Sequence, residues 1–333
     1  MGGKQSKVIK VAPSVPPPPP PMPKPAPLLF GVLPPIAVTM AAILVCISGI
    51  VAALTYLPGV RAAGSWLPPH NNANKRQFEI FALIYSVFWI SCFAVVIVCE
   101  MWRWFNEWEY LYLCLGLDLP LLLQPLLFPL PAERCLPIHQ RYSFKANLWI
   151  AVFAFVGSYW YTHYFYSVLE ARYTFPSHRL NDVPIALYFA AHFYFVTYHT
   201  LSNMILRKIE TRFSMGWKRS LLFWAAVLGF SYFTAFMETL TISSFPYYSF
   251  RDREMAYTVG SAFYGIYFIV SFPAFYRMDE VVNARRPLYS TYQVMMEACG
   301  SSMIVLCLLD FGRLLASVPL EISGKAIYTY VKK

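Results

Sequence analysis

Long apolar runs separated by short polar segments cover most of the chain from residue 36 onward. A membrane-spanning helix needs about 20 mainly apolar residues, so this pattern predicts an all-α, polytopic transmembrane helical bundle with about seven to eight spans. The third run contains Asp118, Pro120, Pro125 and Pro129, so we expect a kinked or re-entrant segment there. The runs lie at 36–57, 78–102, 108–130, 146–169, 185–206, 221–243, 257–276 and 293–316.

Composition supports the membrane interpretation. The chain is 58% hydrophobic and 13% charged, whereas a soluble globular protein carries about 25% charged residues. The net charge of +10 comes mostly from short loops between the runs, where basic residues set membrane orientation and contact anionic lipid. We therefore expect lipid, and no nucleic acid, as a partner. The cysteines form no CxxC pair, so neither a disulfide framework nor a metal site is predicted.

The pattern divides the chain into four segments. Residues 1–28 form a Lys/Pro-rich tail that should be extended and unpacked. Residues 29–67 are an extra anchor helix and loop, 68–316 the main membrane domain, and 317–333 a C-terminal tail. The start MGGKQS matches the N-myristoylation pattern at Gly2, although a chance match explains it equally well. The distribution of Lys and Arg between the loops leaves the orientation open.

Glu238 is the lone carboxylate within the 221–243 run. A charge in hydrocarbon costs roughly 2.5–3.5 kcal/mol on insertion scales, so this group should either serve function or bond to another helix. Helical spacing places Glu238 on one face with Ser231 and Ala235. Small residues let helices approach closely, so we expect Glu238 to point into the bundle.

Histidines mark two other runs. His163 lies in the 146–169 run, and Tyr188, His192, His199 and Asn203 are spaced by 4, 7 and 4 residues in the 185–206 run. This stripe fits either a proton-handling surface or a set of hydrogen bonds to neighbouring helices. No cluster of metal-ligand spacing accompanies it.

Ordinary catalytic motifs are missing from the sequence. It has no nucleotide-binding loop, GxSxG, HExxH or histidine-box array. Redox chemistry, phosphoryl transfer and metal hydrolysis therefore have no support. The remaining classes are acid–base chemistry on an apolar molecule, or binding and transport of such a molecule.

Four segments resemble the cycloeucalenol cycloisomerase family, whose members are cyclopropyl sterol isomerases. They are RYSFKANLWI at 141–150, THYFYSVL with ARYTFPS at 162–177, ETLTISSFPYYSF at 238–250 and YGIYFIVSFPAFYRMDE at 264–280. The resemblance extends, with gaps, from about Asn74 to Arg313. Residues 1–68 have no counterpart, and Glu170 stands where the family typically has glycine.

The resemblance implies an enzyme that opens the 9β,19-cyclopropane ring of a pentacyclic sterol, converting cycloeucalenol to obtusifoliol, without redox and without a cofactor. It implies an integral protein of the endoplasmic reticulum that works beside other sterol-biosynthetic membrane enzymes. The alternative is a non-catalytic sterol-binding or scaffold membrane protein.

Ring opening requires an acid for the cyclopropane methylene, stabilisation of a cation at C9 and a base for the C8 proton. We hypothesise that Glu238 donates the proton, that His163 or His199 accepts or relays the C8 proton, and that Asp279 or Glu280 assists at the mouth of the site. Aromatic and polar side chains near these groups would bind the sterol: Tyr159, His192, Asn203, Tyr247 and Tyr248.

Overall fold

A computed structural model of the chain describes residues 35–56, 64–243, 245–282, 287–322 and 326–332. The Lys/Pro-rich tail and the myristoylation-like Gly2 lie outside these described residues. The chain divides into two compact units, residues 1–46 and 47–333. In the first unit, the described residues belong to the beginning of helix α1 (Pro35–Tyr56). The helices after α1 and the strands belong to the second unit.

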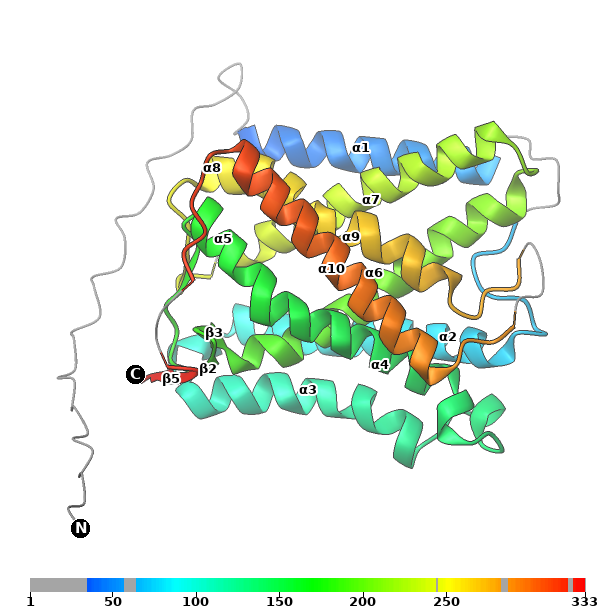
Figure 1. Cartoon of the computed structure of the whole chain (residues 1–333), viewed down its shortest axis with the longest axis horizontal. Coiled ribbons are helices and arrows are strands. Elements are labelled where there is room, and N and C mark those ends of the chain that lie inside the picture. Colours follow the sequence, from blue (N-terminus) through cyan, green and yellow to red (C-terminus); the bar gives the residue numbers. More distant parts are fainter. Residues whose placement is uncertain (1–34, 57–63, 244, 283–286, 323–325, 333) are drawn as a thin grey trace, which may run out of the picture. The chain divides into compact units, whose positions relative to one another are not determined.

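Helices form at the apolar runs that the pattern identified (Figure 1). The helices after α1 are α2 Ala73–Val98, α3 Glu107–Leu127, α4 Tyr142–Val156, α5 Thr162–Val168, α6 Ile185–Arg212, α7 Trp217–Ser243, α8 Arg253–Met255, α9 Ser261–Arg277 and α10 Thr291–Leu315. Single 3-10 turns lie at Met101–Arg103, Pro131–Glu133 and Ile138–Gln140. A π-helical turn (Gly157–Tyr161) joins α4 to α5, and a second π turn (Ala256–Gly260) joins α8 to α9.

Within the described residues, five helical segments are long and apolar enough to cross a membrane: Ala73–Val98, Glu107–Leu127, Trp217–Ile242, Arg253–Arg277 and Thr291–Leu315. The protein is therefore an integral membrane protein. The other predicted runs are also helical, in α1, in α4 with α5, and in α6, but they do not belong to these five.

Helix α3 continues through Pro120 and Pro125 as one helix, and it is long and apolar enough to span a membrane. A proline removes one backbone donor and leaves a carbonyl of the preceding turn without its usual partner. The hydroxyl of Tyr85 on α2 donates to the Leu117 carbonyl at 2.7 Å. This bond ties α2 to α3 next to Gly116, whose carbonyl is the one that Pro120 leaves without its usual donor.

Helix α6 lies at the centre of this unit. It contacts α2, α3, α4, α7 and α9, and in Figure 1 it runs through the middle with α3 on one side and α7 on the other. Small residues bring the outer helices together as well. The predicted small face of α7 is confirmed, since Ser231 and Ala235 are fully buried and a Cβ placed on Gly265 of α9 would lie 3.6 Å from the Ser231 backbone.

Short strands, which the all-α prediction missed, join the loops. β1 (Arg172–Tyr173) pairs antiparallel with β4 (Tyr248–Ser249). β2 (Ser177–Leu180) pairs antiparallel with β3 (Val183–Pro184) and with β5 (Tyr328–Val331), which belongs to the C-terminal tail. In Figure 1 β2, β3 and β5 lie together at one end of the bundle, beside the C-terminus.

A buried network of charges connects α2, α6 and the segment after α9. The guanidinium of Arg207 lies 2.7 Å from the Glu79 carboxylate and 2.8 Å from that of Glu280. Lys75 lies 3.1 Å from the same Glu280 oxygen. Burial alone would raise the pKa of the Glu280 carboxyl, but the positive charges of Lys75 and Arg207 outweigh it and hold the pKa below its ordinary value.

We expect the Glu280→Gln variant to lose roughly 3 kcal/mol of stability at pH 7, because it leaves two buried cations with too little negative charge. A depressed carboxyl pKa contributes stability that is present above the unfolded value, about 4.3, and is lost as pH falls through the folded value. The difference from wild type should therefore shrink below about pH 4. Thermal unfolding in detergent at pH 7 and at lower pH measures it.

The matched control is Glu254→Gln, because Glu254 is exposed in α8. It should unfold with the wild type at every pH. A Glu280→Gln deficit that stayed constant from neutral to acid pH would contradict the electrostatic account and indicate a loss of packing.

Candidate active site

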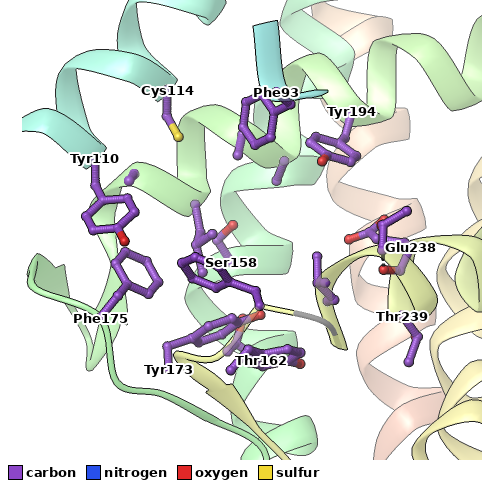
Figure 2. Close-up of a pocket in the computed structure, with 18 of the residues that line it drawn as sticks. Phe93, Tyr110, Cys114, Ser158, Thr162, Tyr173, Phe175, Tyr194, Glu238 and Thr239 are labelled. Carbon is purple, nitrogen blue, oxygen red and sulfur yellow. Dashed lines mark hydrogen bonds between the residues drawn. The ribbon is translucent and has the colours of Figure 1, made fainter. Parts of the chain in front are cut away.

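A cavity of about 300 Å³ lies inside the bundle, close to the β1–β4 pair. It is lined by helices α2, α3, α5, α6, α7 and α9, by the π turn after α4, and by residues of the loops that join them (Figure 2). Nearly half of the lining residues are aromatic, and most of the others are aliphatic. A concave, mainly apolar site with few polar groups is typical of small-molecule binding.

Glu238 on α7 is the only carboxyl group among the described residues that line this cavity, and the described lining includes no histidine, lysine or arginine. In Figure 2 Glu238 faces the cavity from one side, with Tyr110 and Phe175 on the other. The close contact of α7 with α9 at Ser231 and Gly265 fixes the helix that carries it. A single carboxyl group therefore lines a mainly apolar space.

Two phenols hold the Glu238 carboxyl. The hydroxyls of Tyr198 on α6 and Tyr264 on α9 are its hydrogen-bonding neighbours. The Oε2 atom of Glu238 makes no hydrogen bond to the described part of the protein. The phenols thus hold the carboxyl, and its Oε2 atom is buried without a hydrogen bond to the described protein at the edge of the cavity that Glu238 lines.

Aromatic rings surround the same region. Tyr264 and Tyr267 of α9 meet edge to face at 4.7 Å, and Phe165 of α5 lies 5.4 Å from Tyr264. Across the β1–β4 pair, Tyr173 stacks on Tyr248 at 4.4 Å. All five rings line the cavity, and aromatic faces in a dry site attract a cation.

The predicted sterol-binding tyrosines lie in different places. Tyr248 lines the cavity. Tyr247, its neighbour, packs against Trp102 and Phe245 and is not among the described lining residues. Tyr159 stacks on Phe155 at 5.7 Å, also outside the lining.

The polar stripe of α6 bonds to neighbouring helices. His192 lies 2.6 Å from Asp118 of α3 through Nδ1. His199 has Nδ1 2.7 Å from the Phe195 carbonyl and Nε2 2.9 Å from the Ser271 hydroxyl of α9. Asn203 donates to Glu79 of α2 at 3.0 Å. None of these three residues is among the described lining residues of the cavity.

The other predicted residues also lie outside the described lining. His163 is buried against the Tyr166 ring, with ring centroids 5.7 Å apart. Asp279 accepts a bond from Lys145 and another from the Tyr289 amide at 2.8 Å. Glu280 belongs to the buried charge network described above. The structure thus brings Glu238 and Tyr248 together and separates them from the remaining predicted residues.

Sequence reasoning missed the phenols that hold Glu238. Tyr264 lies in the segment 264–280 that carries the family resemblance, so a signal for it existed. Tyr198 follows Tyr194 by one helical turn on α6, and both tyrosines interact electrostatically with Glu238. The spacing of the two tyrosines does not show which helix lies opposite them. In the described residues there is no group of three or more His, Cys, Asp or Glu side chains that could hold a metal ion.

Comparison with known proteins identifies a family for the chain. The chain is 43% identical over 263 residues to cycloeucalenol cycloisomerase of Arabidopsis thaliana, which covers 78% of the chain and 91% of that relative. No family model matches the chain, and no solved structure matches it. This identity over nearly the whole relative shows that the chain belongs to the cycloeucalenol cycloisomerase family.

Proposed function

We propose that this protein is an isomerase that opens the 9β,19-cyclopropane ring of a cyclopropyl sterol, converting cycloeucalenol to obtusifoliol in sterol biosynthesis. The similarity to cycloeucalenol cycloisomerase supports the reaction. The observation in the structure that carries the proposal is one carboxyl group, Glu238, facing an aromatic cavity large enough to be a ligand site.

Glu238 is the proton donor in this proposal. Its O–H bond breaks, the proton goes to the cyclopropane methylene C19, and the electrons of the C9–C19 bond form the new C–H bond. A cation remains at C9. Cyclopropanes are weak bases, so the acid must be well placed in a site without water. The rings of Tyr264, Tyr267 and Phe165 can stabilise the cation by up to about 2 kcal/mol each when desolvated.

The membrane arrangement belongs to the same proposal. Helix α6 contacts four of the five apolar spanning segments, in α2, α3, α7 and α9, so we propose that it crosses the membrane among them. The α4–α5 helix and α1 would complete seven to eight spans. An apolar sterol reaches such a cavity from lipid, and the endoplasmic reticulum, with other sterol-biosynthetic membrane enzymes as neighbours, is the proposed location.

We expect the Glu238→Gln variant to lose turnover by about 10²- to 10⁴-fold, the usual contribution of a positioned general acid. Glutamine has nearly the same shape, so the cavity should still bind sterol. Purified protein in lipid nanodiscs is given cycloeucalenol, and obtusifoliol is measured by gas chromatography. The exposed Glu254→Gln variant is the matched control and should retain wild-type turnover.

Near wild-type turnover by a folded Glu238→Gln variant would show that Glu238 is not the proton donor. If the wild type bound the sterol but formed no product, the non-catalytic sterol-binding alternative would replace the isomerase.

We also expect the Tyr264→Phe variant to lower kcat about five- to tenfold with little change in KM. It removes a hydroxyl that holds Glu238 but keeps the ring in the cavity, and one such hydrogen bond contributes about 1 kcal/mol or somewhat more. Tyr232→Phe is the matched control, because the Tyr232 hydroxyl bonds to the Tyr257 carbonyl at 3.4 Å outside the cavity. Equal effects of the two substitutions would exclude a positioning role for Tyr264.

A further inference from the structure

Ring opening leaves a proton to be removed from C8, and the cavity offers few groups that could take it. Glu238 is the only carboxyl in the described lining, which has no imidazole or amine. The titratable groups that face Glu238 from the elements packed around it are all phenols. They are Tyr194 and Tyr198 of α6, Tyr264 and Tyr267 of α9, Tyr173 of β1 and Tyr248 of β4.

A neutral phenol is a far weaker base than a carboxylate, because accepting a proton would make it an oxonium ion. After Glu238 has donated its proton, the carboxylate is the strongest base in the cavity. It also carries the charge opposite to that of the cation. The two hydroxyls that hold it can donate to its new negative charge, which keeps it in place during the life of the cation.

We propose that Glu238 is both the proton donor and the proton acceptor of the reaction, so that one carboxyl performs both steps. This inference rests on the isomerase function proposed above. It adds a second catalytic step for Glu238 and makes a separate base unnecessary.

The chemistry of the sterol permits this assignment. C19 and C8 are both bonded to C9, so the two reacting positions are neighbours on the ring system. In the first step the Glu238 O–H bond breaks and the C9–C19 electrons form the C19–H bond. In the second step the C8–H bond breaks, its electrons form the C8=C9 double bond, and the proton returns to the carboxylate. The carboxyl ends in its starting form, and no oxidant or reductant is needed.

The histidines predicted as acceptors are less well placed. Both ring nitrogens of His199 are engaged, with the Phe195 carbonyl and the Ser271 hydroxyl. His163 is buried against Tyr166. Neither ring lies in the described lining, so each would need a relay to reach C8, whereas Glu238 itself lines the cavity.

The pH dependence of kcat distinguishes a single carboxyl that acts as both acid and base from a separate acid and base. A single carboxyl that must start protonated gives one ionisation, with kcat flat at low pH and falling tenfold per unit at high pH. A separate acid and base give a bell-shaped profile. The sterol does not ionise in this range, so the ionisations belong to the protein. We would measure kcat of the full-length wild type in nanodiscs from about pH 5 to 10, with thermal unfolding at each pH to separate inactivation from titration.

We expect a single descending ionisation, and its loss together with turnover in the Glu238→Gln variant. A bell-shaped profile from folded protein would overturn the single-carboxyl proposal while leaving the isomerase intact. The partner would then be identified as the residue, His163 or His199, whose glutamine variant abolishes the fall in kcat at low pH. Absence of any Δ8 sterol product from folded wild type at every pH would instead overturn the proposed function itself.

Discussion

The stability of the bundle depends on how its buried charged groups are compensated where no water is available. A carboxylate inside a membrane bundle is costly unless a cation, a hydrogen bond or protonation compensates it. Glu79 and Glu280 are compensated by Arg207, and Glu280 also by Lys75. Asp279 is paired with Lys145 and Asp118 with His192. These pairs connect α2, α3, α4 and α6 with the segment that follows α9, so the cost of each charge is offset by an interaction that holds the bundle together.

The surroundings of Glu238 differ from those of these paired carboxylates. In the described structure its neighbours are phenols, no cation pairs with it, and it lines a mainly apolar cavity. In the proposed reaction a protonated Glu238 would donate its proton, and the same dry environment would strengthen its action on the sterol and protect the cation from water.

Much of this could be predicted from the sequence. Helices form at the apolar runs, because continuous hydrophobicity is a strong local signal. The ion pair of Asp310 and Arg313, at 2.5 Å, is also a local feature, because residues three apart share one face of a helix. The small face of α7 led to Glu238 by the same kind of reasoning, because helical spacing alone places Ser231, Ala235 and Glu238 together.

The rest depends on contacts between segments far apart in the chain. His192 meets Asp118 across 74 positions and Asn203 meets Glu79 across 124, and a stripe on one helix does not reveal the helix opposite. Local conformation was missed as well. Glu170, where the family typically has glycine, has a φ of 48°, in the left-handed region that glycine adopts without steric cost. Its carboxylate pairs with Arg251 at 2.7 Å, a contact across 81 positions of the chain.

In the proposed reaction, the Glu238 carboxyl lies against the reacting carbons of a sterol bound in the aromatic cavity. The most direct test is an experimental structure, by electron cryomicroscopy in nanodiscs, of the Glu238→Gln variant with cycloeucalenol bound. We expect sterol density in the cavity, with the cyclopropane ring against residue 238 and near the rings of Tyr264 and Tyr267. Sterol density elsewhere, or a cyclopropane ring turned away from residue 238, would contradict it.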